Sequence, residues 1–163
     1  MKLNLSDKPE FEMRKPCRYL YVRTHAPFPD HAPQAWSELH RLLGVTDLMR
    51  EGREFAGICW DEEQHVAEKD ARYDAALLLD KDSENIDVPS GMKLGTLPGG
   101  RYARFIYQGP YSNLALAFDQ ALTRWAAPSG AKLRRAPYLE VYLNNPETTP
   151  PQDLKTAILI PVE

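Results

Sequence analysis

The stretch that decides the fold is Arg101–Trp125, RYARFIYQGPYSNLALAFDQALTRW, which changes from a strand pattern to a helix pattern. In Arg101–Tyr107, aromatic or polar side chains alternate with apolar ones, as they do along a strand. After Gly109-Pro110, apolar residues recur at spacings of three and four, which predicts an amphipathic helix that begins at Ser112. The stretch therefore predicts a strand followed directly by a helix.

The same succession of patterns occurs earlier in the chain. His25-Ala26-Pro27-Phe28 resembles Gln108-Gly109-Pro110-Tyr111 at an offset of 83 residues, and a helical pattern follows each. We expect the earlier helix to follow Pro33, with Asp30 as its cap, and to end at Gly44. This similarity indicates an internal duplication.

Segments of strand character surround both helices. They are Phe11–Lys15, Arg18–Thr24, Glu54–Trp60, Asp74–Asp80, Met92–Leu97, Arg101–Tyr107, Tyr138–Leu143 and Ala157–Val162. The order is ββαββ twice, over residues 11–80 and 92–163. We expect a single α+β domain over residues 1–163, in which two pseudo-symmetric ββαββ repeats form an antiparallel sheet with a central ligand cleft.

Composition argues against several classes of function. The 20 basic and 23 acidic residues give a net charge of −3, and no basic run could follow a phosphate backbone, so direct nucleic-acid binding is disfavoured. No apolar stretch approaches the ~20 residues that span a bilayer. With no signal-peptide pattern and two cysteines, Cys17 and Cys59, we expect a cytoplasmic protein with reduced thiols.

The alternation of side chains along the strand Tyr138–Leu143 separates two chemical faces. Leu139, Val141 and Leu143 share one face, whereas Tyr138, Glu140 and Tyr142 share the other. We expect the aliphatic face to lie beneath a helix. The aromatic face, with one carboxylate in its middle, is then expected to line the cleft.

Other strands contribute aromatic residues in the same way, because their tyrosines alternate with aliphatic residues. Arg18–Thr24 places Leu20 and Val22 opposite two tyrosines, and Arg101–Tyr107 places Ala103 and Phe105 opposite a third. The predicted cleft wall consists of Tyr19, Tyr21, Trp60, Tyr102, Tyr138 and Tyr142, with Glu140 inside. Such a cleft suits flat, apolar or cationic small molecules.

Glu140 and Tyr111 each allow two interpretations. A carboxylate between two tyrosines on an inward face is desolvated, which raises its pKa and prepares it to act as a base or to bind a cation. From spacing alone, Glu140 is equally well interpreted as an exposed strand residue paired with a lysine. Tyr111, at the entry to a helix, either closes the cleft or packs against the helix start.

No metal or cofactor site is expected. The acidic stretch 61–70 is interpreted as a solvated loop, because its side chains are consecutive and do not converge. The four histidines, His25, His31, His40 and His65, show neither ligand spacing nor a serine or cysteine partner in a recognisable arrangement.

A set of short motifs, taken together, resembles one known family. The motifs are Pro98-Gly99-Gly100-Arg101-Tyr102-Ala103, Gln108-Gly109-Pro110-Tyr111, Pro137–Asn144 and Ile158–Val162, with Gly57-Ile58 and Arg72-Tyr73-Asp74-Ala75 in the first half. They resemble the GyrI-like small-molecule-binding domain, a family that includes effector-binding domains of multidrug-responsive transcription regulators and a stand-alone DNA gyrase inhibitor. The resemblance implies a cleft with Glu140 at its floor, where cationic aromatic drugs bind.

The resemblance leaves two classes of function open. Some stand-alone relatives hydrolyse cyclopropane-bearing alkylating toxins, which implies Glu140 as the base and Tyr111 or Tyr142 as the donor to the developing anion. The alternative is a non-catalytic binder that sequesters ligands or modulates a protein partner such as DNA gyrase. No segment resembles a helix-turn-helix, so we do not expect the chain itself to be a drug-responsive transcription factor.

Overall fold

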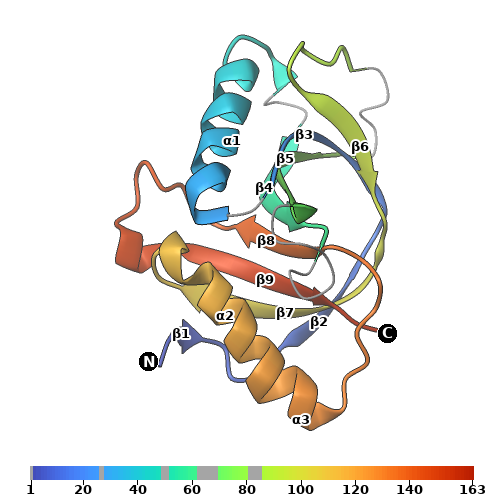
Figure 1. Cartoon of the computed structure of the whole chain (residues 1–163), viewed down its shortest axis with the longest axis vertical. Coiled ribbons are helices and arrows are strands. Elements are labelled where there is room, and N and C mark those ends of the chain that lie inside the picture. Colours follow the sequence, from blue (N-terminus) through green and yellow to red (C-terminus); the bar gives the residue numbers. More distant parts are fainter. Residues whose placement is uncertain (1, 26–27, 49–51, 62–69, 81–85) are drawn as a thin grey trace. The chain divides into compact units, whose positions relative to one another are not determined.

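The computed structural model describes residues 2–25, 28–48, 52–61, 70–80 and 86–163. The chain divides into two compact units. Unit 1 comprises Met1–Arg14 and Gly100–Glu163, and unit 2 comprises Lys15–Gly99. Each unit consists of antiparallel strands and one long helical segment (Figure 1), which confirms the predicted α+β class. The predictions made for residues 26–27 and 62–69 fall outside the described residues.

Unit 2 is a four-stranded antiparallel arrangement with a helix on one face. In spatial order, its strands are β4 (Gly52–Cys59), β5 (Arg72–Leu79), β3 (Cys17–His25) and β6 (Lys93–Leu97). The helix α1 (Phe28–Leu43) contacts β3 and β5 (Figure 1). The buried core beneath it includes Leu20, Leu39, Leu43, Tyr73, Ala75, Leu77 and Leu79.

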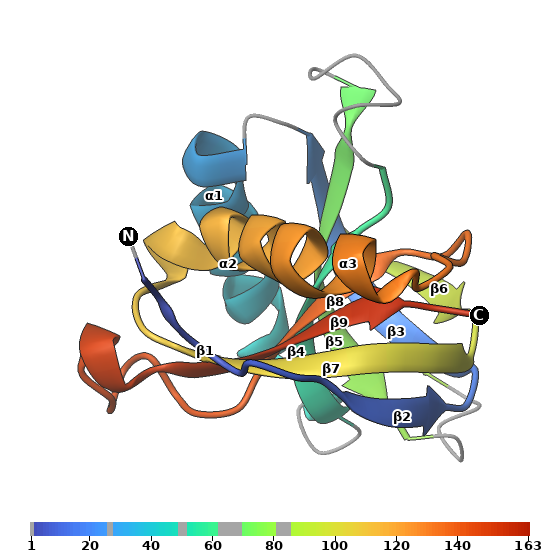
Figure 2. The ribbon, with the colours of Figure 1, turned by 90° about the horizontal axis from the view of Figure 1, so that it is seen from below.

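Unit 1 places β9 (Lys155–Pro161) between β7 (Gly100–Gln108) and β8 (Tyr138–Tyr142). The other edge of β7 pairs first with β1 (Asn4–Leu5) and then with β2 (Glu10–Arg14), and Figure 2 shows β2 running beside β7. The buried core of this unit joins alternate residues of β7 and β9 to one face of its helix. Its members include Ala103, Phe105, Leu114, Ala117, Ala121, Ile158 and Ile160.

The helical segment of unit 1 has an irregular middle. It starts as the 3-10 turn η3 (Tyr111–Asn113) and continues as α2 (Leu114–Ala121), the π-helical turn η4 (Leu122–Ala126) and α3 (Ala127–Ser129). These parts follow one another as a single rod (Figure 2). The segment ends at Gly130, whose φ of 71° is a left-handed conformation that glycine adopts without strain. The last short turn, η5 (Pro151–Asp153), leads into β9.

Both predicted helices begin elsewhere than expected. The helix α1 starts at Phe28, so Pro33 lies inside it instead of in its first turn. Ser112 belongs to η3, and Asn113 is the N-cap of α2, without a side-chain hydrogen bond. A 3-10 turn precedes the α-helix along the chain because the carbonyl of Pro110 accepts a hydrogen bond from the Asn113 N–H at 3.2 Å.

The first strand of each sequence repeat lies in the unit that the other repeat builds. β2 belongs to the first repeat of the sequence, yet it pairs with β7 in unit 1. Conversely, β6 belongs to the second repeat and pairs with β3 in unit 2. The units in space therefore differ from the repeats in sequence by an exchange of edge strands.

The pairing registers of the two units agree with a duplication. In unit 2, Tyr19 pairs with Leu78, and in unit 1, Tyr102 pairs with Pro161, each residue being 83 positions after its counterpart. The same offset relates the pair Cys59–Tyr73 to the pair Tyr142–Thr156. Short sequence matches, such as Cys59-Trp60 with Val141-Tyr142, predict an offset of 82 in the second half of each repeat. The pairing registers show that this prediction is wrong, because the offset there is also 83.

The predicted faces are confirmed for β3 and β7 and wrong for β8. Leu20 of β3 and Phe105 of β7 lie in the cores beneath the helices, as expected. On β8, however, Tyr138 and Tyr142 pack against the core that contains α2, so the aromatic face is the one that the helix covers. Leu139 and Val141, which point the opposite way, are also buried. Because both faces of β8 are covered, the type of apolar residue does not tell which face meets the helix.

Candidate functional site

The strands β8 and β9 place a carboxylate and two hydroxyl groups on the α2 side of unit 1. Glu140 pairs with Ile158, and Tyr142 pairs with Thr156, in the antiparallel ladder. Directly opposed residues of an antiparallel pair project from the same face. Since Ile158 lies in the core beneath α2, Glu140, Tyr142 and Thr156 share that face.

The turn after β7 brings Tyr111 to the same place. Gly109 has a φ of +151°, and a Cβ there would overlap the hydroxyl of Tyr107. That hydroxyl donates a hydrogen bond to the carbonyl of Pro110 at 2.9 Å, which fixes the turn. The Tyr111 ring then lies 5.1 Å from that of Tyr142, centroid to centroid. We call Glu140, Tyr142, Tyr111 and Thr156 the Glu140 cluster.

The Glu140 carboxyl is buried, and the described part of the chain places no cationic partner beside it. It is 9% exposed, and burial raises its pKa to about 7, although the hydrogen bond from Tyr142 acts in the opposite direction. The Tyr142 hydroxyl donates that bond to Oε2 at 2.6 Å. Among the residues that the structure describes, no lysine, arginine or histidine pairs with Glu140. This excludes the interpretation of Glu140 as an exposed residue paired with a lysine.

Two hydroxyl groups of the cluster have no hydrogen-bond partner among the residues with described positions. Tyr111 Oη and Thr156 Oγ1 are buried, and neither has a partner within the described part of the chain. Burial, and then the negative charge of Glu140, raise the pKa of Tyr111, so its hydroxyl remains protonated near neutral pH. The cluster thus combines a desolvated carboxyl, unpaired hydroxyl groups and aromatic rings, which are the features of a small-molecule site.

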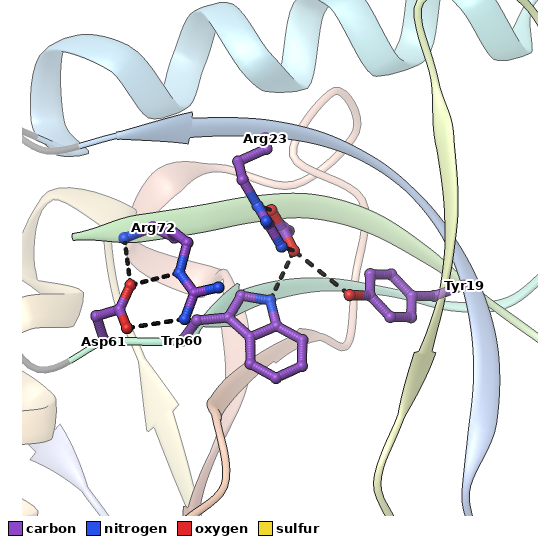
Figure 3. A network of polar contacts seen from close by, with 6 residues as sticks. Tyr19, Arg23, Trp60, Asp61 and Arg72 are labelled. Atoms are coloured by element: carbon purple, nitrogen blue, oxygen red, sulfur yellow. Dashed lines mark hydrogen bonds and ion pairs between the residues drawn. The ribbon is translucent and has the colours of Figure 1, made fainter. Parts of the chain in front are cut away.

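A second buried carboxylate, Asp74 of β5, lies in unit 2 on the face opposite α1. Arg23 binds it through Nε to Oδ1 at 2.7 Å and through Nη2 to Oδ2 at 2.9 Å. The indole N–H of Trp60 donates to Oδ2 at 2.7 Å, and the Tyr19 hydroxyl donates at 3.5 Å (Figure 3). The Tyr19 ring packs directly on Gly95, where a Cβ would overlap it. We call Asp74, Arg23, Trp60 and Tyr19 the Asp74 cluster.

An ion pair adjoins this cluster. Asp61 accepts hydrogen bonds from the backbone N–H, Nε and Nη2 of Arg72 at 2.7–3.0 Å (Figure 3), and these bonds lower the pKa of Asp61. The Arg72 guanidinium lies 5.8 Å from the centroid of the Trp60 ring. Unlike Glu140, Asp61 and Asp74 already have cationic partners. We therefore interpret these two ion pairs as contacts that stabilise unit 2.

The structure therefore distributes the predicted site residues over three places. Glu140, Tyr111, Tyr142 and Tyr138 lie on the α2 side of unit 1, where the Tyr138 ring meets Phe118. Tyr19, Tyr21 and Trp60 project from the face of unit 2 that α1 does not cover. Tyr102 lies on the face of β7 away from α2, where Arg134 stacks 5.0 Å from its ring centroid. The cleft wall as a single surface stays a prediction.

Two buried polar residues, Asp74 and Thr156, were not identified from the sequence. Asp74 directly precedes the apolar run Ala75–Leu79 in a strand pattern, and a charge next to such a run signals a buried pair. Thr156 gave no signal of its own, because a threonine in a strand is ordinary. Thr156 becomes a candidate site residue only because it pairs with Tyr142, in the strand that also carries Glu140.

The described residues contain no group of three histidine, cysteine, aspartate or glutamate side chains that could hold a metal ion. Within the same residues, no helix is both long and apolar enough to traverse a bilayer.

Comparison with known proteins gives a family match and several relatives. The family of GyrI-like small molecule binding domains matches residues 7–163. The probable transcriptional regulator YgiV of Escherichia coli K12 is 32% identical over 107 residues, which span 65% of this chain and 65% of that protein.

Two solved structures share the fold. SAV2435 bound to tetraphenylphosphonium superposes with a TM-score of 0.69 at 16% identity, over 96% of this chain and 94% of that one. A hydrolase encoded by lin2189 from Listeria innocua superposes with a TM-score of 0.64 at 16% identity, over 97% and 93%.

Proposed function

This chain belongs to the family of GyrI-like small-molecule-binding domains, and we propose that it binds aromatic cations at the Glu140 cluster. The observation that carries the proposal is the Glu140 carboxyl, buried among aromatic rings with no cation beside it in the described residues. A carboxylate in this condition is unstable when charged, and a bound cation supplies the missing partner.

Aromatic side chains add a second source of affinity. The rings of Tyr111 and Tyr142 lie 5.1 Å apart at an angle of 51°, and ring faces attract cations within about 6 Å. The similarity to SAV2435, which was solved with the lipophilic cation tetraphenylphosphonium, supports this ligand class. Tyr19, Tyr21, Trp60, Tyr102 and Tyr138 stay predicted ligand contacts, and a DNA gyrase partner likewise stays a prediction.

Cation affinity is expected to rise with pH through neutrality. With a pKa of about 7, Glu140 is mostly protonated at pH 6 and mostly ionised at pH 8. Because the ionised form attracts a cation, the affinity for benzyltrimethylammonium should increase about tenfold between these values. Isothermal titration calorimetry at each pH measures the dissociation constant.

Neopentylbenzene, the uncharged isostere of that cation, provides the control, and its affinity should not change with pH. Replacing Glu140 with glutamine should abolish both the pH dependence and the preference for the charged compound. A Glu140→Gln protein that still binds the cation more tightly at pH 8 than at pH 6 would remove Glu140 from this role.

Hydrolysis of a reactive substrate is a second candidate, favoured by the same raised pKa and by the similarity to a hydrolase. Ionised Glu140 would take a proton from water, the water oxygen would bond to a cyclopropane carbon, and the ring C–C bond would break. Tyr111 or Tyr142 would donate a hydrogen bond to the developing anion, and the freed carbon would then take the proton. Mass spectrometry of a cyclopropane-bearing alkylating compound should show the addition of one water, and Glu140→Gln should abolish it.

A further inference from the structure

Two hydroxyl oxygens of the Glu140 cluster have no hydrogen-bond partner among the described residues. Tyr111 Oη and Thr156 Oγ1 are both buried and accept no hydrogen bond from residues that the structure describes, and Thr156 is fully buried. Buried polar groups in folded proteins are nearly always paired with protein or water, so an unpaired group at a ligand site suggests a ligand atom. Because each hydroxyl proton can rotate, each oxygen is able to accept a hydrogen bond.

The carboxyl of Glu140 provides a third acceptor. Its Oε2 accepts the Tyr142 proton, whereas Oε1 receives no hydrogen bond from the described residues. The negative charge of Glu140 acts on Tyr111, and Thr156 pairs across the strands with Tyr142. The acceptors therefore lie around one end of β8, on the face that α2 covers.

This set of acceptors matches a particular kind of cation. A primary ammonium group carries three N–H donors, so it can neutralise Glu140 and pair with hydroxyl oxygens at once. A quaternary ammonium or phosphonium ion supplies charge but no donor, so it leaves the Tyr111 and Thr156 oxygens unpaired. Leaving a buried polar group unpaired lowers affinity for the ligand that lacks its partner.

We propose that the Glu140 cluster selects protonated amines with N–H donors over permanently alkylated cations, with Tyr111 and Thr156 as the residues that determine this specificity. The inference rests on the proposed binding of cations at Glu140. Charge and aromatic rings alone would bind protonated amines and permanently alkylated cations equally well. The two hydroxyl groups add a requirement for N–H donors.

The experiment compares benzylammonium with benzyltrimethylammonium at pH 8 by isothermal titration calorimetry. Each cation is titrated into the full chain and into the Tyr111→Phe and Thr156→Val variants, which remove a hydroxyl and keep the side-chain shape. Each variant should weaken benzylammonium binding by at least threefold and leave benzyltrimethylammonium binding unchanged. Thr148→Val, which removes an exposed hydroxyl, should affect neither cation.

The outcomes separate the inference from the proposed function. Equal losses for both cations, or no loss for either, would overturn the specificity while cation binding at Glu140 stands, provided that Glu140→Gln weakens both. Absence of binding by either cation would overturn both proposals. Should Thr156→Val fail to fold, as judged by its melting curve, the two titrations of Tyr111→Phe decide the question alone.

Discussion

Replacing Asp74 with alanine should lower the free energy of unfolding by about 3–5 kcal/mol, the usual cost of removing one partner from a buried ion pair. The Asp74 side chain is fully buried and accepts two hydrogen bonds from Arg23 and one from Trp60. Alanine leaves the half-buried Arg23 guanidinium without its counter-ion and the indole N–H without its acceptor. Urea denaturation followed by circular dichroism measures the change.

Glu38→Ala is the matched control for Asp74→Ala. Glu38 pairs with Arg41 on the exposed side of α1, where solvent screens the attraction between the charges, so its loss should leave stability almost unchanged. If Asp74→Ala were no more destabilising than Glu38→Ala, the Asp74 cluster would not hold unit 2 together.

Replacing Glu140 with glutamine should stabilise the protein at pH 8 and have little effect near pH 4. The fold raises the pKa of Glu140 from 4.5 to about 7, so the folded chain binds this proton more tightly than the unfolded chain. Stability therefore falls as pH rises through the window from 4.5 to 7, by about 3 kcal/mol in total. Glutamine does not titrate, so the variant escapes this loss and exceeds the natural protein above pH 7.

Thermal melts of both proteins from pH 4 to pH 8 test this prediction, with the exposed Glu147→Gln as the control. The difference in melting temperature between Glu140→Gln and the natural protein should grow with pH and then level off, whereas Glu147→Gln should show no trend. A Glu140→Gln variant that is less stable at pH 8 would mean that the ionised carboxylate is stabilised in the fold. If Glu140→Gln is more stable at pH 8 and also binds cations more weakly, then Glu140 lowers the stability of the protein while it contributes to ligand binding.

Strand positions were the best-predicted part of the fold because alternation is a local property of the chain. Every predicted strand corresponds to an observed one with shifts of a few residues, for example Tyr138–Leu143 against β8. The two-residue β1 was missed, since so short a strand has no readable pattern. Helix starts were less accurate: α1 begins at Phe28, ahead of Pro33, and the 3-10 turn after Pro110 moves the start of α2 beyond Ser112.

The candidate site was predictable in composition but only partly in arrangement. Glu140, Tyr142 and Tyr111 were predicted and are close together, since the first two share a strand face and the third follows a Gly-Pro turn. Which aromatic residues join them depends on which face each helix covers. That choice involves packing between distant segments, and sequence alternation alone does not contain it.

The exchange of edge strands also sets an order for folding. Unit 2 is one continuous segment, Lys15–Gly99, whereas unit 1 must join its N-terminal strand β2 to β7 across the whole of that segment. Closing so long a loop costs chain entropy that nearby pairings such as β4 with β5 avoid. During synthesis, unit 2 can form while β2 is still without a partner, because β7 is made later. The strand β2 is therefore made before unit 2 but is fixed in place only after β7 has been made.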